Sequence, residues 1–162
     1  MLKFVGIAAF EKAVKAELKK FEDEAIAEMK EAARVVVQAF TERTPAWSGE
    51  TVRNYTIGIG APAGGGVKTP SGSLPAPGEN VGLAPGEERN HAINAAAAMR
   101  DAETVMKGFT KLQDLYLTNT VRADKWDLID HGNAPFPGLG RNPGGVSTLA
   151  EQSARNRLKN FK

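Results

Sequence analysis

The chain contains no cysteine. This absence excludes disulfide bonds, thiolate metal ligands and a cysteine nucleophile. Histidine is scarce as well, because His91 and His131 are the only two and lie far apart in the sequence. No carboxylates group with them, so we expect no histidine-based metal site. The sequence also lacks an apolar run of about 18 residues, the length that a membrane-spanning helix requires.

The N-terminal stretch Met1 to Phe10 has one lysine and a short apolar run that passes directly into charged sequence. Without a clear cleavage site, it is not a convincing signal peptide. The net charge is only +2, and this mildly basic balance does not by itself require nucleic acid. A length of 162 residues with 41% hydrophobic content fits one domain, residues 1–162. We expect a soluble protein made and kept in a cytoplasm.

The most regular pattern predicts a helix from about Phe10 to Arg43. Its apolar face recurs at three- and four-residue steps, at Phe10, Val14, Leu18, Phe21, Ala25, Met29, Ala33, Val36 and Phe40. Such a helix is about 50 Å long, which exceeds what a domain of this size usually buries. Part of it should project, break or pack on a neighbouring subunit. The apolar face widens after Met29, so we expect that half to be the buried one.

A proline ends this helix, because Thr44 precedes Pro45 and is pushed out of the α region. Ser48-Gly49 continues the turn. The alternation from Thr51 to Ile59 then predicts a strand with its Arg53 end exposed. Three of its residues should face the core: Tyr55, Ile57 and Ile59.

Two segments rich in glycine and proline predict long loops, at residues 60–86 and 133–145. A loop as long as 60–86 inside a compact domain is usually functional or disordered, so we expect a flexible or assembly loop.

The remaining segments predict further helices and strands. In order, they are a helix at Glu87–Lys107, a strand at Asp114–Val121, a helical turn or strand at Lys125–His131, and a helix at Val146–Phe161 with Ser147 as its N-cap. This order indicates an α+β fold. We expect the long N-terminal helix to pack on a small, mostly antiparallel sheet, with the other helices and the long loops around it.

No pattern in the sequence indicates catalysis or a bound cofactor. Asp130 and His131 lack the converging partners that acid–base or metal chemistry needs, so a polar turn is the better interpretation. His91 lies near a helix start, where we expect a surface role. Gly64 to Gly66 followed by Lys68 lacks the spacing of a phosphate-binding loop. We therefore expect no enzyme, no catalytic residue, no metal and no cofactor.

Large aromatic and basic side chains are candidates for contacts. Trp126 should anchor a loop to the core, whereas Trp47 either does the same or contacts another subunit. Lys68 and Arg141 are further candidate subunit contacts. The basic C-terminal helix could touch DNA phosphates only non-specifically, since no aromatic residues are interleaved with it.

Two segments together resemble a known family. The first is the long helix with Thr44-Pro45, Ser48-Gly49 and Val52-Arg53-Asn54, and the second is Leu117 to Val121 with Trp126, Ile129-Asp130 and Gly132. This order is similar to the phage neck or tail-completion proteins, the group that includes the lambdoid minor tail protein Z. The resemblance rests on these residues: Thr44, Pro45, Gly49, Arg53, Asn119, Trp126, Asp130 and Gly132.

The resemblance implies a structural virion protein of a tailed bacteriophage. Such subunits would form a ring of six or twelve copies between the head connector or stopper and the tail terminator or tube, with DNA in the channel. A ring needs heterologous, closing contacts. We expect the helix to pack within the ring and the loops to contact rings above or below. Deletion of Ala63–Gly82 should then leave folding intact but abolish head–tail joining.

Other functions remain open at this stage. The adjacent tail terminator is the main alternative, since it is also a ring former with an α+β fold. A small toxin or nucleic-acid-binding protein is supported only by the mild basicity, and an enzyme is supported by nothing in the sequence.

Overall fold

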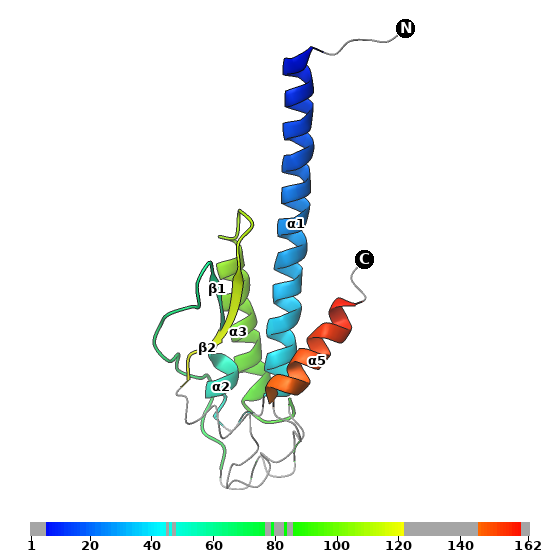
Figure 1. Ribbon diagram of the computed structural model, residues 1–162. Helices are drawn as coiled ribbons and strands as arrows, with labels where there is room; N and C mark the ends of the chain where they lie inside the picture. The colour runs from blue at the N-terminus through cyan, green and yellow to red at the C-terminus, as the bar shows by residue number, and fades with distance from the viewer. Residues whose placement is uncertain are drawn as a thin grey trace.

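The computed structural model describes residues 6–44, 46, 48–76, 79, 83, 86–121 and 146–159. Within these residues, helices pack against a two-stranded sheet. The helices are α1 (Ile7–Arg43), α2 (Glu50–Arg53), α3 (His91–Met106) and α5 (Val146–Leu158), and the strands are β1 (Tyr55–Ile59) and β2 (Leu115–Asn119). The predicted α+β class, with a long N-terminal helix and a small antiparallel sheet, is confirmed (Figure 1).

The helix α1 has a free half and a packed half. It spans 37 residues, or about 55 Å, and its N-terminal half stands clear of every other helix and strand (Figure 1). Its C-terminal half carries the buried residues Ala33, Val35, Val37 and Ala39 and packs against α3, α5 and the sheet. The prediction that the half after Met29 is the buried one is therefore confirmed. The other half is unbroken and projects (Figure 1), which is one of the arrangements expected for it.

The sheet joins distant parts of the chain to this packed half. β1 and β2 pair antiparallel from Tyr55 opposite Asn119 to Ile59 opposite Leu115. Alternation along β1 turns Ile57 toward the core. There it joins buried residues from two helices, and Leu115 and Leu117 of β2 pack against the same cluster: Ala33, Val37, Ile57, Ala102 and Met106.

The strand predicted at Thr51–Ile59 is wrong in its first half. Residues Glu50–Arg53 form the helical turn α2, and only Tyr55–Ile59 is a strand. The cause is Gly49, whose φ of 82° places it in the left-handed region. Its carbonyl then accepts a hydrogen bond from the Arg53 amide at 2.8 Å, which closes one helical turn before the strand begins. The predicted core positions Tyr55 and Ile57 are buried, and Ile59 is half-buried.

The two later helices are shorter than the sequence predicts. α3 begins at His91, because residues 88–90 form a turn in which the His91 amide donates to the Glu88 carbonyl. α5 begins at Val146, so Ser147 is the second helical residue and the prediction that it is the N-cap is wrong. α5 buries Val146, Ala150 and Ala154. It crosses the C-terminal half of α1 (Figure 1).

Candidate functional site

The two segments that carry the family resemblance meet in the structure. The Asn119 side-chain amide donates to the Thr51 carbonyl at 2.9 Å. Thr120 adds two bonds to Asn54: its hydroxyl donates to the side-chain oxygen at 2.9 Å, and its amide donates to the carbonyl at 3.3 Å. The turn around Gly49 and the end of β2 thus form one polar joint.

Thr44 fastens the end of α1 to this joint. Its hydroxyl donates to the Phe40 carbonyl at 2.7 Å, so the Tyr55 hydroxyl, 2.8 Å away, is the donor to Thr44. Phe40 and Tyr55 also stack edge to face, with ring centroids 5.7 Å apart. Because Thr44 is completely buried, it has a structural role in ending the helix and fixing β1.

Gly49 leaves space for a buried asparagine. A Cβ atom on Gly49 would lie 2.1 Å from Nδ2 of Asn94, which is fully buried in α3. The Asn94 amide donates to the carbonyls of Ser71 and Asn90, and its oxygen accepts from the Ser71 amide at 2.8 Å. Gly49 is therefore required both for its positive φ and for close approach.

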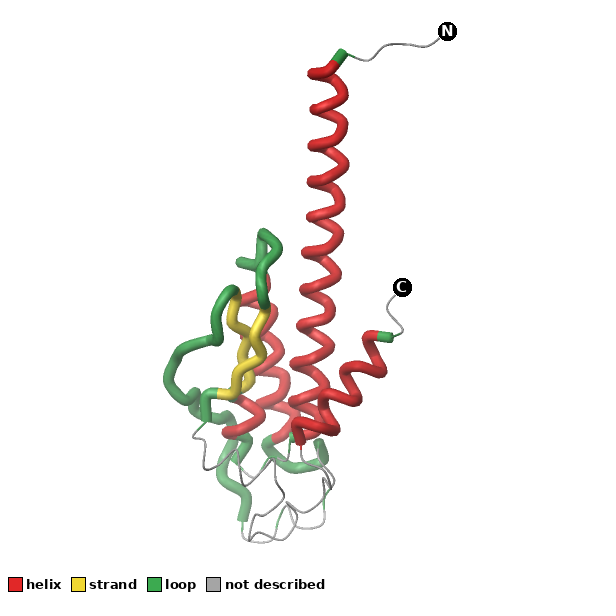
Figure 2. The backbone as a smooth tube through the Cα atoms, viewed as in Figure 1, coloured by secondary structure: helices red, strands yellow, loops and turns green. Residues whose placement is uncertain are grey.

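Asparagine side chains hold the segment after β1 by its main chain. Asn94 bonds to the main chain of Ser71, as described above. Asn54 likewise accepts from the Lys68 amide at 2.7 Å and donates to the Lys68 carbonyl at 3.0 Å. Asn90 donates to the Ser73 carbonyl at 2.9 Å. The described part of the predicted loop at 60–86 therefore runs beside the sheet as an attached segment (Figure 2).

These attachments argue against the expectation that removing the loop leaves folding intact. Deletion of Ala63–Gly82 would remove the bonds that the buried Asn54 and Asn94 make to Lys68 and Ser71, and a buried polar group left without a partner costs about 1–3 kcal/mol. We expect a fall in the thermal unfolding midpoint, measured by circular dichroism. The control replaces Gly64 and Gly66, which have no heavy atom near their Cβ positions, by serine. An unchanged midpoint for the deletion would contradict the role of these bonds.

Arg53 and Lys68 converge on one carboxylate. The Arg53 guanidinium and the Lys68 ammonium both donate to Oδ2 of Asp101 at 2.7 Å. Burial acts to raise the pKa of Asp101, but the hydrogen bonds and charges of Lys68 and Arg53 outweigh it, and the pKa is lowered. The prediction that Arg53 is exposed is wrong, because its side chain is only 17% exposed. This cluster ties α2 and the attached segment to α3.

The Asp101 cluster gives a pH-dependent prediction. A carboxyl group whose pKa is lower in the folded state stabilises the fold above its ordinary value of about 3.9. That contribution is lost as the pH falls through the lowered folded value. Urea unfolding from pH 3 to 7 should show Asp101→Asn less stable than the parent near neutrality, with the gap closing at the acid end. Asp23→Asn, which breaks an exposed pair, is the control and should change little.

The side chain of His91 is buried and links α3 to α1, so the prediction of a surface role is wrong. It is 5% exposed, and its Nε2 lies 2.8 Å from the Thr41 carbonyl. Since a carbonyl can only accept, Nε2 is the donor. The position at the start of α3 turns the ring toward the last turns of α1, which the sequence could not reveal.

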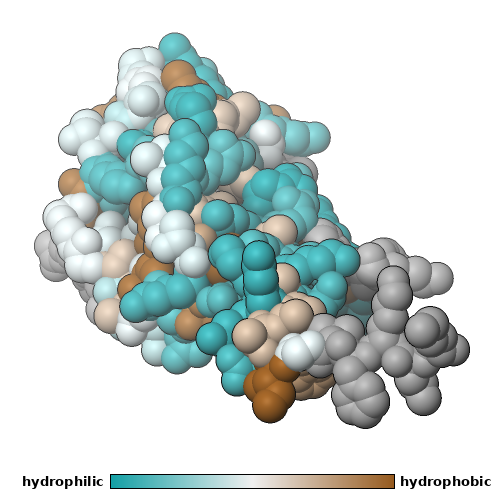
Figure 3. Space-filling model, turned by 90° about the horizontal axis from the view of Figure 1, so that it is seen from above, coloured by the Kyte–Doolittle hydropathy of each residue, from teal (hydrophilic) through white to brown (hydrophobic). Residues whose placement is uncertain are grey.

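A row of large apolar side chains lies exposed along the free half of α1. We call Ile7, Phe10, Val14, Leu18 and Phe21 the apolar stripe. Their exposed fractions run from 40% for Val14 to 79% for Ile7. From the end of α1, the visible surface is mostly hydrophilic, with hydrophobic side chains in small separate areas (Figure 3). An apolar patch of this size, aligned along one face of a projecting helix, is often an interaction surface.

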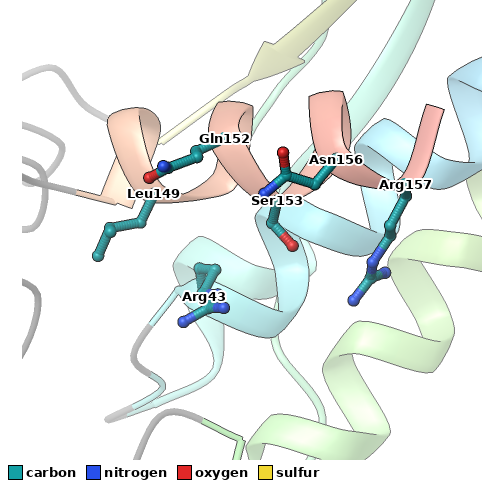
Figure 4. Close-up of a pocket in the computed structure, with 6 residues that line it drawn as sticks. All are labelled: Arg43, Leu149, Gln152, Ser153, Asn156 and Arg157. Carbon is teal, nitrogen blue, oxygen red and sulfur yellow. The ribbon is translucent and has the colours of Figure 1, made fainter. Parts of the chain in front are cut away.

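A polar cleft of about 380 Å³ lies between the end of α1 and α5 (Figure 4). It is lined by Arg43, Leu149, Gln152, Ser153, Asn156 and Arg157. Arg157 is already paired with Glu42. Burial acts to raise the pKa of Glu42, but hydrogen bonds from Arg157 and Gln38 lower it overall. The carboxylate offsets the nearby positive charge, so the cleft has no clear preference for an anion.

The described residues offer no metal centre and no membrane segment. They hold no group of three or more histidine, cysteine, aspartate or glutamate side chains that could bind a metal ion. None of their helices combines the length and apolar content needed to cross a bilayer.

The structure brings together five of the eleven predicted site residues. Thr44, Gly49, Arg53 and Asn119 belong to the polar joint and its attachments, together with the candidate contact Lys68. The other predicted residues lie outside the described residues: Pro45, Trp47, Trp126, Asp130, Gly132 and Arg141.

The sequence named Asn54 only as part of the motif Val52-Arg53-Asn54, and it did not single out Asn90, Asn94 or Asp101. A signal was present for Asn94, because asparagine is a poor helix former and interrupts an alanine-rich helix on its buried side. Comparisons with protein-family models, curated proteins and solved structures gave no match.

Proposed function

We propose that this chain is a structural subunit of a tailed bacteriophage virion, one that assembles into a ring of six or twelve copies at the neck, where the tail joins the head. The observation that carries the proposal is the apolar stripe on the free half of α1. An apolar row this long is covered most simply by other subunits in an assembly.

The neck as the place of assembly rests on the family resemblance. The two segments of the resemblance meet in the polar joint through Asn119, Thr120 and Asn54. This contact is a physical reason why both segments would occur in the same sequence. The same joint holds the attached segment that follows β1, which would present a fixed surface to a neighbouring ring. Connector or stopper proteins on one side and terminator or tube proteins on the other are the partners that this function implies.

Negative-stain microscopy of the purified full-length chain tests the proposal. Closed rings of six or twelve copies are the expected result, with only weak, salt-sensitive binding to duplex DNA in a gel-shift assay. A monomer that shifts DNA at physiological salt would contradict the proposal and favour a nucleic-acid-binding protein. Joining of purified heads and tails by the added protein would test the position at the neck.

A further inference from the structure

The apolar stripe continues into the packed half of α1 with a regular spacing. From Ile7 to Met29 the apolar residues recur at steps of three, four and four. Eleven residues then cover three turns, or about 3.67 residues per turn, close to the α-helical value. The row therefore stays nearly straight along the helix, which is the arrangement that lets two long helices pack side by side.

The row is also self-complementary about its centre. If a second helix runs in the opposite direction across Leu18, Val14 lies opposite Phe21, and Phe10 lies opposite Ala25 of the other copy. Larger side chains then face smaller ones, the condition for interdigitated packing. We propose that the apolar stripe binds the same stripe of a second copy, with the two α1 helices antiparallel. The inference rests on the proposed function only in treating the stripe as an assembly surface. Because a twofold contact closes on itself, the heterologous contacts that close a ring would lie elsewhere on the subunit.

The charges beside the stripe favour this direction. Helical periodicity places Glu17 on one border of the row and Glu22 on the other. In a parallel pair, residues five positions apart on opposite borders face each other, so Glu17 would meet Glu22 of the partner and repel it. In an antiparallel pair the same borders face each other, so Lys15 of each copy lies near Glu22 of the other. These two attractions outweigh the single approach of Glu17 to the partner's Glu17, whereas the parallel pair has two Glu17–Glu22 repulsions.

The size of the surface fits a specific dimer. The five exposed side chains present on the order of 500 Å² in each copy. A twofold contact would bury on the order of 1,000 Å², the lower bound for a specific interface with good complementarity. A membrane surface fits less well, because glutamates border the stripe and anionic lipids would repel them. Pairing of two copies would also keep the stripe covered before they join a larger assembly.

Cysteine cross-linking tests both the partner and the direction. The chain has no cysteine of its own, so Val14→Cys, Leu18→Cys and Phe21→Cys can each be made as a single thiol at an exposed position. Under mild oxidation, Leu18→Cys should cross-link with itself. A mixture of Val14→Cys and Phe21→Cys should give several-fold more dimer than either variant alone.

Three outcomes would overturn the inference. Efficient self-cross-linking of Val14→Cys would indicate a parallel pair. Absence of any cross-link in Leu18→Cys, or a monomeric mass for the parent chain in light scattering at micromolar concentration, would leave the stripe to another partner. Rings in the microscope without these cross-links would contradict the antiparallel pair alone, and cross-links without rings would contradict the proposed function alone.

Discussion

Replacing Leu18 and Phe21 by glutamate should abolish the pairing of two copies through the apolar stripe while leaving the fold intact. Each buried leucine or phenylalanine contributes about 1.5–3 kcal/mol, so losing two from each copy should weaken a pairwise contact by at least on the order of 10⁴-fold. Both side chains are exposed on the free half of α1, and glutamate is compatible with a helix. Sedimentation velocity should therefore show a mass no more than half that of the parent assembly, and far-ultraviolet circular dichroism should be unchanged.

The matched control places the same charges on the opposite face of the same helix. Ala9→Glu with Ala16→Glu adds two glutamates at exposed positions that lie away from the stripe by helical periodicity. This variant should associate like the parent chain. If both double variants dissociate alike, added charge and not the stripe is responsible. If both associate normally, the stripe is not the assembly surface.

The second large effect concerns the approach of Gly49 to Asn94. Gly49→Ala forces a left-handed residue to carry a Cβ, at a cost of about 1 kcal/mol, and pushes that atom onto the Asn94 side chain. Loss of the bonds that Asn94 makes to Ser71 and Asn90 adds about 2 kcal/mol. We expect a total of about 3 kcal/mol, and a midpoint lower by about 2–4 °C per kcal/mol for a chain of this size.

A double-mutant cycle separates the backbone effect from the contact. Asn94→Ala alone should cost about 3 kcal/mol, because it leaves backbone groups of Ser71 without partners. In that background, Gly49→Ala should cost only the backbone term of about 1 kcal/mol, since the clash is gone. Urea unfolding of the four proteins measures this. Additive effects would mean that the close approach is unimportant. Gly64→Ala, at an open position, is the control.

The sequence predicted features that depend on local periodicity. The three- and four-residue recurrence places α1 within a few residues of its ends, and the proline after Thr44 marks its C-terminus. The alternation around Ile57 and the segment Leu115–Val121, with its tyrosine and threonines, predict the two strands that pair. These features come from neighbouring residues along one helix or strand, so an isolated sequence is sufficient to find them.

The wrong predictions concern residues whose structure is decided by contacts with residues distant in the sequence or by a special backbone conformation, and not by their own conformational preference. Thr51 and Val52 have side chains that favour strands, but the positive φ of Gly49 starts a helical turn there. Arg53 was expected to be exposed because charged residues usually are, yet its partner Asp101 lies 48 positions away. His91 was misjudged for the same reason, since the carbonyl of Thr41 that accepts its hydrogen bond is 50 positions distant.

The way in which the segment after β1 is attached has a consequence for variation. Asn54, Asn90 and Asn94 bond to peptide groups of Lys68, Ser71 and Ser73. Peptide groups are common to all residues except for the missing proline amide. The exposed side chains of Val67, Thr69 and Leu74 take no part in these bonds. Substitutions at these positions could therefore change the chemical character of this surface while its shape stays constant.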